Sequence, residues 1–146
     1  MAAAAAGLAL TLAGCGVVSA FPQPQSLPGD LFTASRQSDA APAGFHDDVE
    51  RTSCGDVRLG QGELLPSDAA SCMNAAIGAT NAELAVITPT TEGDPIVTFY
   101  RTSADSPGFE LYVNGSYDRY GAGEWAHLTC PSTDISVLNG CVEDAS

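Results

Sequence analysis

The five cysteines are the residues of this chain whose type and spacing most clearly point to chemistry. Cys15 ends a Leu12-Ala13-Gly14-Cys15 run, and the stretch from Ala2 to Gly14 before it carries no charged side chain. A membrane-spanning helix needs about 20 apolar residues, so this stretch is too short to span a bilayer. It has instead the length of the apolar region of a signal peptide. Small residues before Cys15 leave the backbone open to processing enzymes, and the Cys15 thiol is a nucleophile that could take a lipid group.

The Leu-Ala-Gly-Cys run resembles the lipobox of bacterial lipoproteins, in which the cysteine is lipidated and becomes the new N-terminus. The resemblance implies a signal peptide over residues 1–14 and a lipid with chains such as palmitate on Cys15, on the extracytoplasmic face of a cell membrane. Each acyl CH₂ group buried in the bilayer contributes about 0.8 kcal/mol, so two chains hold a protein there. The alternative is a soluble secreted protein in which Cys15 has no role. Because no Arg or Lys precedes the apolar stretch, we expect the natural start codon upstream of Met1.

The other four cysteines form an even set in a chain that is predicted to be exported, and exported proteins keep their disulfides. Four cysteines allow three pairings. We favour Cys54 with Cys72 and Cys130 with Cys141, because both pairs close short loops. Each bond would add about 3 kcal/mol of stability in the chain-entropy account. Zinc sites use closely spaced Cys pairs, which are absent from this sequence, so we predict no metal and no other cofactor.

The charge composition restricts the classes of partner. Eighteen acidic and five basic residues give a net charge of −13, and there is no lysine. Nucleic acids are bound through Lys and Arg contacts to phosphate, so we predict no nucleic-acid partner. A basic ligand or a cation remains electrostatically compatible. The missing lysine also excludes Schiff-base and Ser-Lys catalysis.

Aromatic and arginine side chains gather around the "YDRYG" stretch that starts at Tyr117. Such side chains are enriched at the hot spots of binding surfaces. The competing interpretation is a half-buried loop with a local Asp–Arg pair and a core tryptophan. The candidate recognition patch consists of Tyr112, Tyr117, Asp118, Arg119, Tyr120 and Trp125.

Catalysis has weaker support. Glu92 and Asp94 flank Gly93, and with Asp118 they are the carboxylates that could act as acid and base in a cell-envelope hydrolase. A tight turn explains Gly93 and Asp94 equally well. The sequence has no G-x-S-x-G serine motif, and His127 stands alone in a strand-like run. We therefore predict no catalytic residue. The favoured function is a non-enzymatic module that binds an envelope protein or a small ligand, with the hydrolase as the alternative. A surface protein without a discrete site is a third interpretation.

The domain organisation follows from composition and periodicity. Residues 15–52 are rich in Pro, Ser, Ala and Asp, with isolated apolar residues such as Leu31 and Phe45, and predict a flexible tether. Residues 53–142 predict a small α+β domain, and 143–146 a tail. The domain would contain an extended entry near Asp56 and a helix between Pro66 and Gly78, followed by strands within 82–91, 94–103, 108–115 and 124–130. The expected architecture is one helix covering an antiparallel meander of three or four strands, in two layers stapled by disulfides.

The order of these features resembles a group of small lipoproteins of unknown function from Gram-positive bacteria, common in actinobacteria. The residues that carry the resemblance are Cys54-Gly55-Asp56, Cys72, the "PTTEGDPI" turn, the "YDRYG" loop, Trp125 and Cys130. It spans about residues 53–141. The resemblance implies a membrane-anchored extracytoplasmic domain and supplies no catalytic residue.

Overall fold

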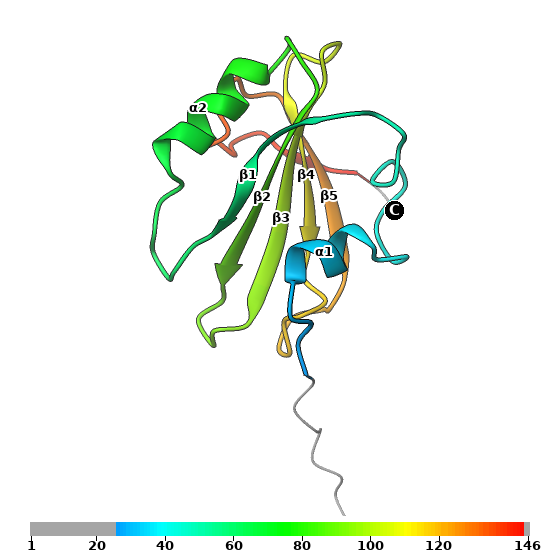
Figure 1. Cartoon of the computed structure of the whole chain (residues 1–146), viewed down its shortest axis with the longest axis vertical. Helices are drawn as coiled ribbons and strands as arrows, with labels where there is room; N and C mark the ends of the chain where they lie inside the picture. Colours follow the sequence, from blue (N-terminus) through cyan, green and yellow to red (C-terminus); the bar gives the residue numbers. More distant parts are fainter. Residues whose placement is uncertain (1–25, 145–146) are drawn as a thin grey trace, which may run out of the picture.

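A sheet of six strands in the order β1-β2-β3-β4-β5-β6 organises the computed structural model, which describes residues 26–144 (Figure 1). The predicted signal peptide, Cys15 and the first part of the predicted tether lie outside the described residues. The elements are α1 (Leu31–Arg36), β1 (Thr52–Arg58), α2 (Ser67–Ala76), β2 (Ala82–Pro89), β3 (Pro95–Thr102), β4 (Phe109–Asn114), β5 (Trp125–Cys130) and β6 (Val142–Glu143).

The sheet is mixed rather than a simple meander. β1 runs parallel to β2, and every later neighbour pair is antiparallel. Parallel neighbours need a crossover connection, and α2 supplies it between β1 and β2. The pairing of β1 is interrupted between Ser53 and Gly55, where Gly55 adopts a φ of +116° that favours glycine. With β1 and β6 at its edges, the sheet has six strands rather than the predicted three or four.

One face of the sheet packs against α2. Successive residues of a strand point to opposite faces, so Leu84 and Val86 of β2 share this face with Phe109 and Leu111 of β4. The helical spacing predicted for α2 is confirmed, because its buried residues are Ala69, Met73 and Ala76. Ile135, from the segment after β5, completes this core with 1% of its surface exposed.

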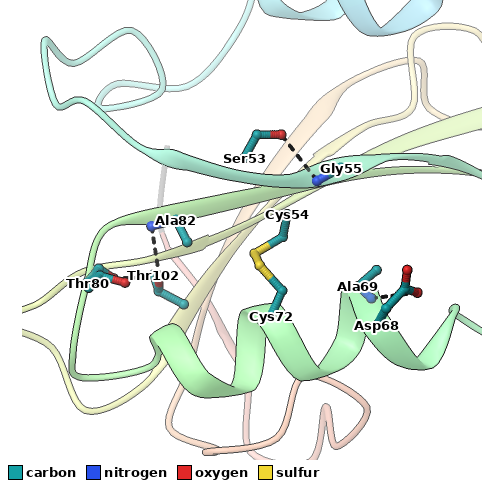
Figure 2. Close-up of a disulfide and its surroundings, with 9 residues drawn as sticks. All are labelled: Ser53, Cys54, Gly55, Asp68, Ala69, Cys72, Thr80, Ala82 and Thr102. Carbon is teal, nitrogen blue, oxygen red and sulfur yellow. Dashed lines mark hydrogen bonds between the residues drawn. A yellow bond between two sulfur atoms is a disulfide. The ribbon is translucent and has the colours of Figure 1, made fainter.

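Both favoured disulfides are present. Cys54–Cys72 joins β1 to α2, with Cα atoms 5.7 Å apart (Figure 2). Cys130–Cys141 joins the end of β5 to the segment that precedes β6. The first bond thus fixes the edge strand β1 to α2, and the second fixes β5 to the segment that leads into the edge strand β6.

The opposite face is covered by residues that the sequence assigned to the tether. Leu31 of α1 and Phe45 of the following loop are 4% and 3% exposed, and they pack on a sheet face that includes Val97 and Phe99. Figure 1 shows α1 in front of the strands. Asp30 caps α1, because its Oδ1 accepts a hydrogen bond from the amide of Phe32 at 3.0 Å.

These contacts correct two expectations. Segments pack on both faces of the sheet, so the two-layer arrangement is wrong, and the folded unit includes residues from about 31 onward rather than 53. The sequence shows no periodicity here because one short helix and single anchoring side chains cover the face. The predicted tail also starts too early, because Glu143 belongs to β6, which pairs with β5.

Replacing Phe45 tests whether this second covering layer supports the fold. We expect Phe45→Ala to lower the free energy of unfolding by about 3–5 kcal/mol, the usual range for a buried phenylalanine. Urea denaturation followed by circular dichroism measures the loss. The control is Leu64→Ala, because Leu64 is 88% exposed and its truncation should change little. A loss no larger than that of the control would show that residues 31–51 do not stabilise the domain.

Candidate functional site

The structure separates the six residues of the candidate recognition patch. Tyr112 is 3% exposed and its ring centroid lies 5.2 Å from that of Phe45. Trp125 is half-buried, 5.0 Å from the same ring. Tyr117 is also half-buried, and its hydroxyl accepts a hydrogen bond from Ser35. Tyr120 is 73% exposed. Tyr112, Tyr117 and Trp125 therefore belong to the aromatic core of the α1 face, and Arg119 and Tyr120 are the exposed members of the patch.

Arg119 pairs with Asp94 and not with Asp118. Its Nε and Nη2 both lie 2.9 Å from Asp94 Oδ1, and its backbone amide donates to Oδ2 at 3.1 Å. These hydrogen bonds hold the pKa of the Asp94 carboxyl below its ordinary value. Asp118 accepts a hydrogen bond from the amide of Tyr120 and so closes its own loop. The Arg119–Asp94 pair ties the β4–β5 loop to the β2–β3 turn.

The three carboxylates considered for hydrolysis therefore have local structural partners. Asp94 is ionised and ion-paired, whereas a general acid must hold a proton near neutral pH. Glu92 accepts a hydrogen bond from the hydroxyl of Thr91 at 2.7 Å. Gly93 takes a φ of +88° in the turn between them, which matches the turn interpretation. Within residues 26–144, no three His, Cys, Asp or Glu side chains are grouped to hold a metal ion.

A hollow of about 580 Å³ opens beside β5. Its walls come from the loop after α1, the β4–β5 loop and the chain after β6. This volume falls in the range of small-molecule sites, about 300–1,000 Å³. The residues that line the hollow are Ala40, Pro42, Ala43, Ser116, Gly123, Glu124, Trp125, His127 and Asp144.

The aromatic core fixes the two ring-bearing residues of the hollow. Trp125 packs on Phe45 and lies parallel to Phe99, with ring centroids 6.2 Å apart. His127 stacks on Tyr112 at 4.2 Å, because β4 and β5 pair these two residues directly. Both rings therefore belong to a rigid layer rather than to a mobile loop.

Hydrogen bonds fix His127 and Asp144, two polar side chains of the hollow, in place. His127 Nδ1 lies 3.1 Å from Asp144 Oδ2, and the amide of Asp144 donates to the carbonyl of His127 at 2.9 Å. Thr129 donates its hydroxyl hydrogen to the same carboxylate at 3.0 Å. The buried Nε1 of Trp125 and Nε2 of His127 have no hydrogen-bond partner among the described residues. Buried polar atoms without a partner are rare in folded proteins and require an explanation such as a bound water, an ion or a functional role.

Phe45, which supports this layer, is itself positioned by charge. Arg101 donates to the carbonyl of Phe45 at 2.7 Å and lies 4.1 Å from the centroid of its ring. Glu83 pairs with Arg101 at 2.7 Å and with Arg36 at 3.1 Å, and Arg36 also pairs with Asp56. These two carboxylates hold the pKa of the Arg36 guanidinium above its ordinary value, with Asp56 the larger cause. The network is complete in itself, which favours a structural role for it.

Trp125 is predicted from the sequence as a site residue, whereas the hollow beside it is not. Its alanine and proline wall lies in the "DAAPA" stretch, which has the composition of a linker, and Asp144 lies in the predicted tail. His127 stands alone in the sequence, far from His46, the other histidine of the chain. The one available signal was the alternation in β4 and β5, which puts Tyr112 and His127 on the same face as Phe99.

No protein-family model, curated protein or solved structure matches the chain. The resemblance to small lipoproteins therefore stays a prediction from sequence. Among residues 26–144, no helix is both long and apolar enough to cross a membrane.

The Arg119–Asp94 pair predicts a specific pH dependence. Because the folded-state pKa of Asp94 lies below the ordinary 3.8, the pair stabilises the fold fully above about pH 4. This stabilisation is lost as the pH falls through the folded-state pKa. We expect Asp94→Asn to lower the urea midpoint at pH 7, and the difference from wild type to shrink below pH 4. Asp105→Asn, at an exposed loop position, is the matched control. Equal midpoints at pH 7 would rule out the stabilising role.

Proposed function

We propose that this chain is a membrane-anchored extracytoplasmic lipoprotein whose domain binds a small ligand in the hollow beside β5. The observation that carries the binding role is the hollow itself, in which Trp125 and His127 are held by a packed aromatic layer. Ligand sites combine such apolar surface with a few fixed polar groups. Here the polar groups are the imidazole of His127 and the carboxylates of Glu124 and Asp144.

The anchor rests on the Leu12-Ala13-Gly14-Cys15 run and on the two disulfides. Disulfides persist in oxidising compartments, and lipoproteins of the predicted kind are exported to one. Between Cys15 and α1 lie residues 16–30, which span at most roughly 50 Å when fully extended. A domain joined to a lipid anchor by a linker of this length would stay near the membrane surface.

The concave shape of the hollow favours a small ligand over a protein as its binding partner. Protein-binding hot spots need aromatic or arginine side chains that reach the partner, and most of the candidate patch is buried or paired. The hydrolase alternative is not favoured, because Asp94 is ion-paired to Arg119, and Glu92 and Asp118 accept hydrogen bonds from residues of their own loops. No specific observation favours a second function.

The anchor is tested by the intact mass of the protein from the membrane fraction of cells that express it with its natural start. We expect a chain that begins at Cys15 and carries a diacylglycerol adduct, with a gain of about four daltons on reduction of the two disulfides. Cys15→Ser should remain unlipidated, since it lacks the acceptor thiol. An unlipidated wild-type chain in the soluble fraction would contradict the anchor.

Binding in the hollow is tested with the fluorescence of Trp125, the one tryptophan of the chain. Three phenyl probes of similar size are titrated: 2-phenylethylamine, 2-phenylethanol and 3-phenylpropanoate. We expect a saturable change in emission with at least one probe. Ala43→Phe should remove it by filling the hollow, with Ala40→Phe as a second blocking variant. Ala75→Phe, at an exposed position of α2, should leave it unchanged. No saturable response to any probe would contradict the binding role.

A further inference from the structure

We infer that the ligand of the hollow is an organic cation, a molecule with an apolar body and an ammonium group. The inference rests on the proposed function and names its substrate class. It follows from the charge of the groups that line the hollow and from the nature of its walls.

The charged side chains that line the hollow are acidic. Glu124 and Asp144 contribute carboxylates, and neither Arg nor Lys lines the hollow. Glu110, next to the hollow, places a third carboxylate 3.7 Å from His127 Nε2. An anionic ligand would lie beside these groups without a guanidinium or ammonium partner. A positively charged group would gain favourable interactions with the same carboxylates.

The arginines of the chain are engaged elsewhere. Arg36, Arg51, Arg101 and Arg119 pair with carboxylates away from the hollow. Arg58 lies 6.0 Å from the ring centroid of Phe32. Within residues 26–144, the Glu124 side chain forms no ion pair or hydrogen bond, so its charge is available for a ligand, whereas Asp144 Oδ2 already contacts His127 and Thr129. The net charge of −13 also attracts cations to the protein from a distance.

The remaining surface suits an apolar body that carries the charge. Ala40, Pro42 and Ala43 form a wall without charged atoms, and Trp125 offers an aromatic ring. Tryptophan is the best of the aromatic residues for cation–π attraction, which acts within about 6 Å of the ring. A bare metal ion fits less well, since residues 26–144 hold no group of three metal-ligating side chains.

The three phenyl probes separate charge from shape. We expect the dissociation constant of 2-phenylethylamine to be at least about tenfold lower than that of 2-phenylethanol, which corresponds to about 1.4 kcal/mol. 3-Phenylpropanoate should give no saturation in the same concentration range. Raising the ionic strength should weaken binding of the amine and leave the alcohol unaffected. Each titration follows Trp125 emission excited at a wavelength where the phenyl group does not absorb.

Removing one carboxylate tests the source of the selectivity. Glu124→Gln should weaken binding of the amine several-fold and leave the alcohol unchanged. Asp144→Asn should act in the same direction. The matched control is Glu92→Gln, which removes the same charge from an exposed turn outside the hollow. An equal effect of Glu92→Gln and Glu124→Gln would show that only net charge matters and would overturn the inference.

The outcomes distinguish this inference from the function beneath it. If the alcohol or the acid binds as tightly as the amine, and Ala43→Phe blocks it, the hollow is a binding site but its ligand is not a cation. If no probe binds, both the proposed binding role of the hollow and the inferred cationic ligand are wrong. If Ala43→Phe and Ala40→Phe leave amine binding intact, the amine binds elsewhere and the inference is wrong.

Discussion

The interaction on which this structure most depends is the anchoring of Phe45 against the sheet. Its ring packs on Phe99, Tyr112 and Trp125, and its carbonyl accepts a hydrogen bond from Arg101. This single side chain fixes the middle of an otherwise irregular segment that covers one face of the sheet. Without it, the sheet would expose the aromatic residues of β3, β4 and β5 to water, and the loop that forms one wall of the hollow would lose its support.

Charge makes that anchoring specific. Arg101 is 6% exposed, and burying a guanidinium is costly unless it is paired and hydrogen-bonded. Glu83 and the carbonyl of Phe45 satisfy it together, and Arg36 extends the network to Asp56 on β1. A change to one of these partners leaves a buried charge on another. The network therefore favours one position of the α1 segment over others that would bury similar apolar area.

The parts of the fold that could be predicted are those in which apolar residues recur at helical or strand spacing. The helix between Pro66 and Gly78 and the four strands after it show regular spacing or β-rich composition, and each appears close to its predicted bounds. The disulfides follow from cysteine parity and loop length. By contrast, α1 spans only six residues, and β6 only two, too few for a pattern. The parallel pairing of β1 with β2 depends on the crossover by α2, and alternation within the entry strand carries no information about strand direction.

The hollow was harder to predict than the fold because its walls come from segments that are far apart in the sequence. Its aromatic residues belong to β5, and alternation could place them on a face. Its other walls come from a linker-like loop and from the chain after β6. Cys130–Cys141 turns the chain back toward β5, β6 then pairs with Leu128 and Thr129, and Asp144 thereby reaches His127. A cross-link that the sequence presents as a stabilising element thus also positions a carboxylate of the candidate site. The stability of the domain and the geometry of the candidate site are therefore connected through that one disulfide.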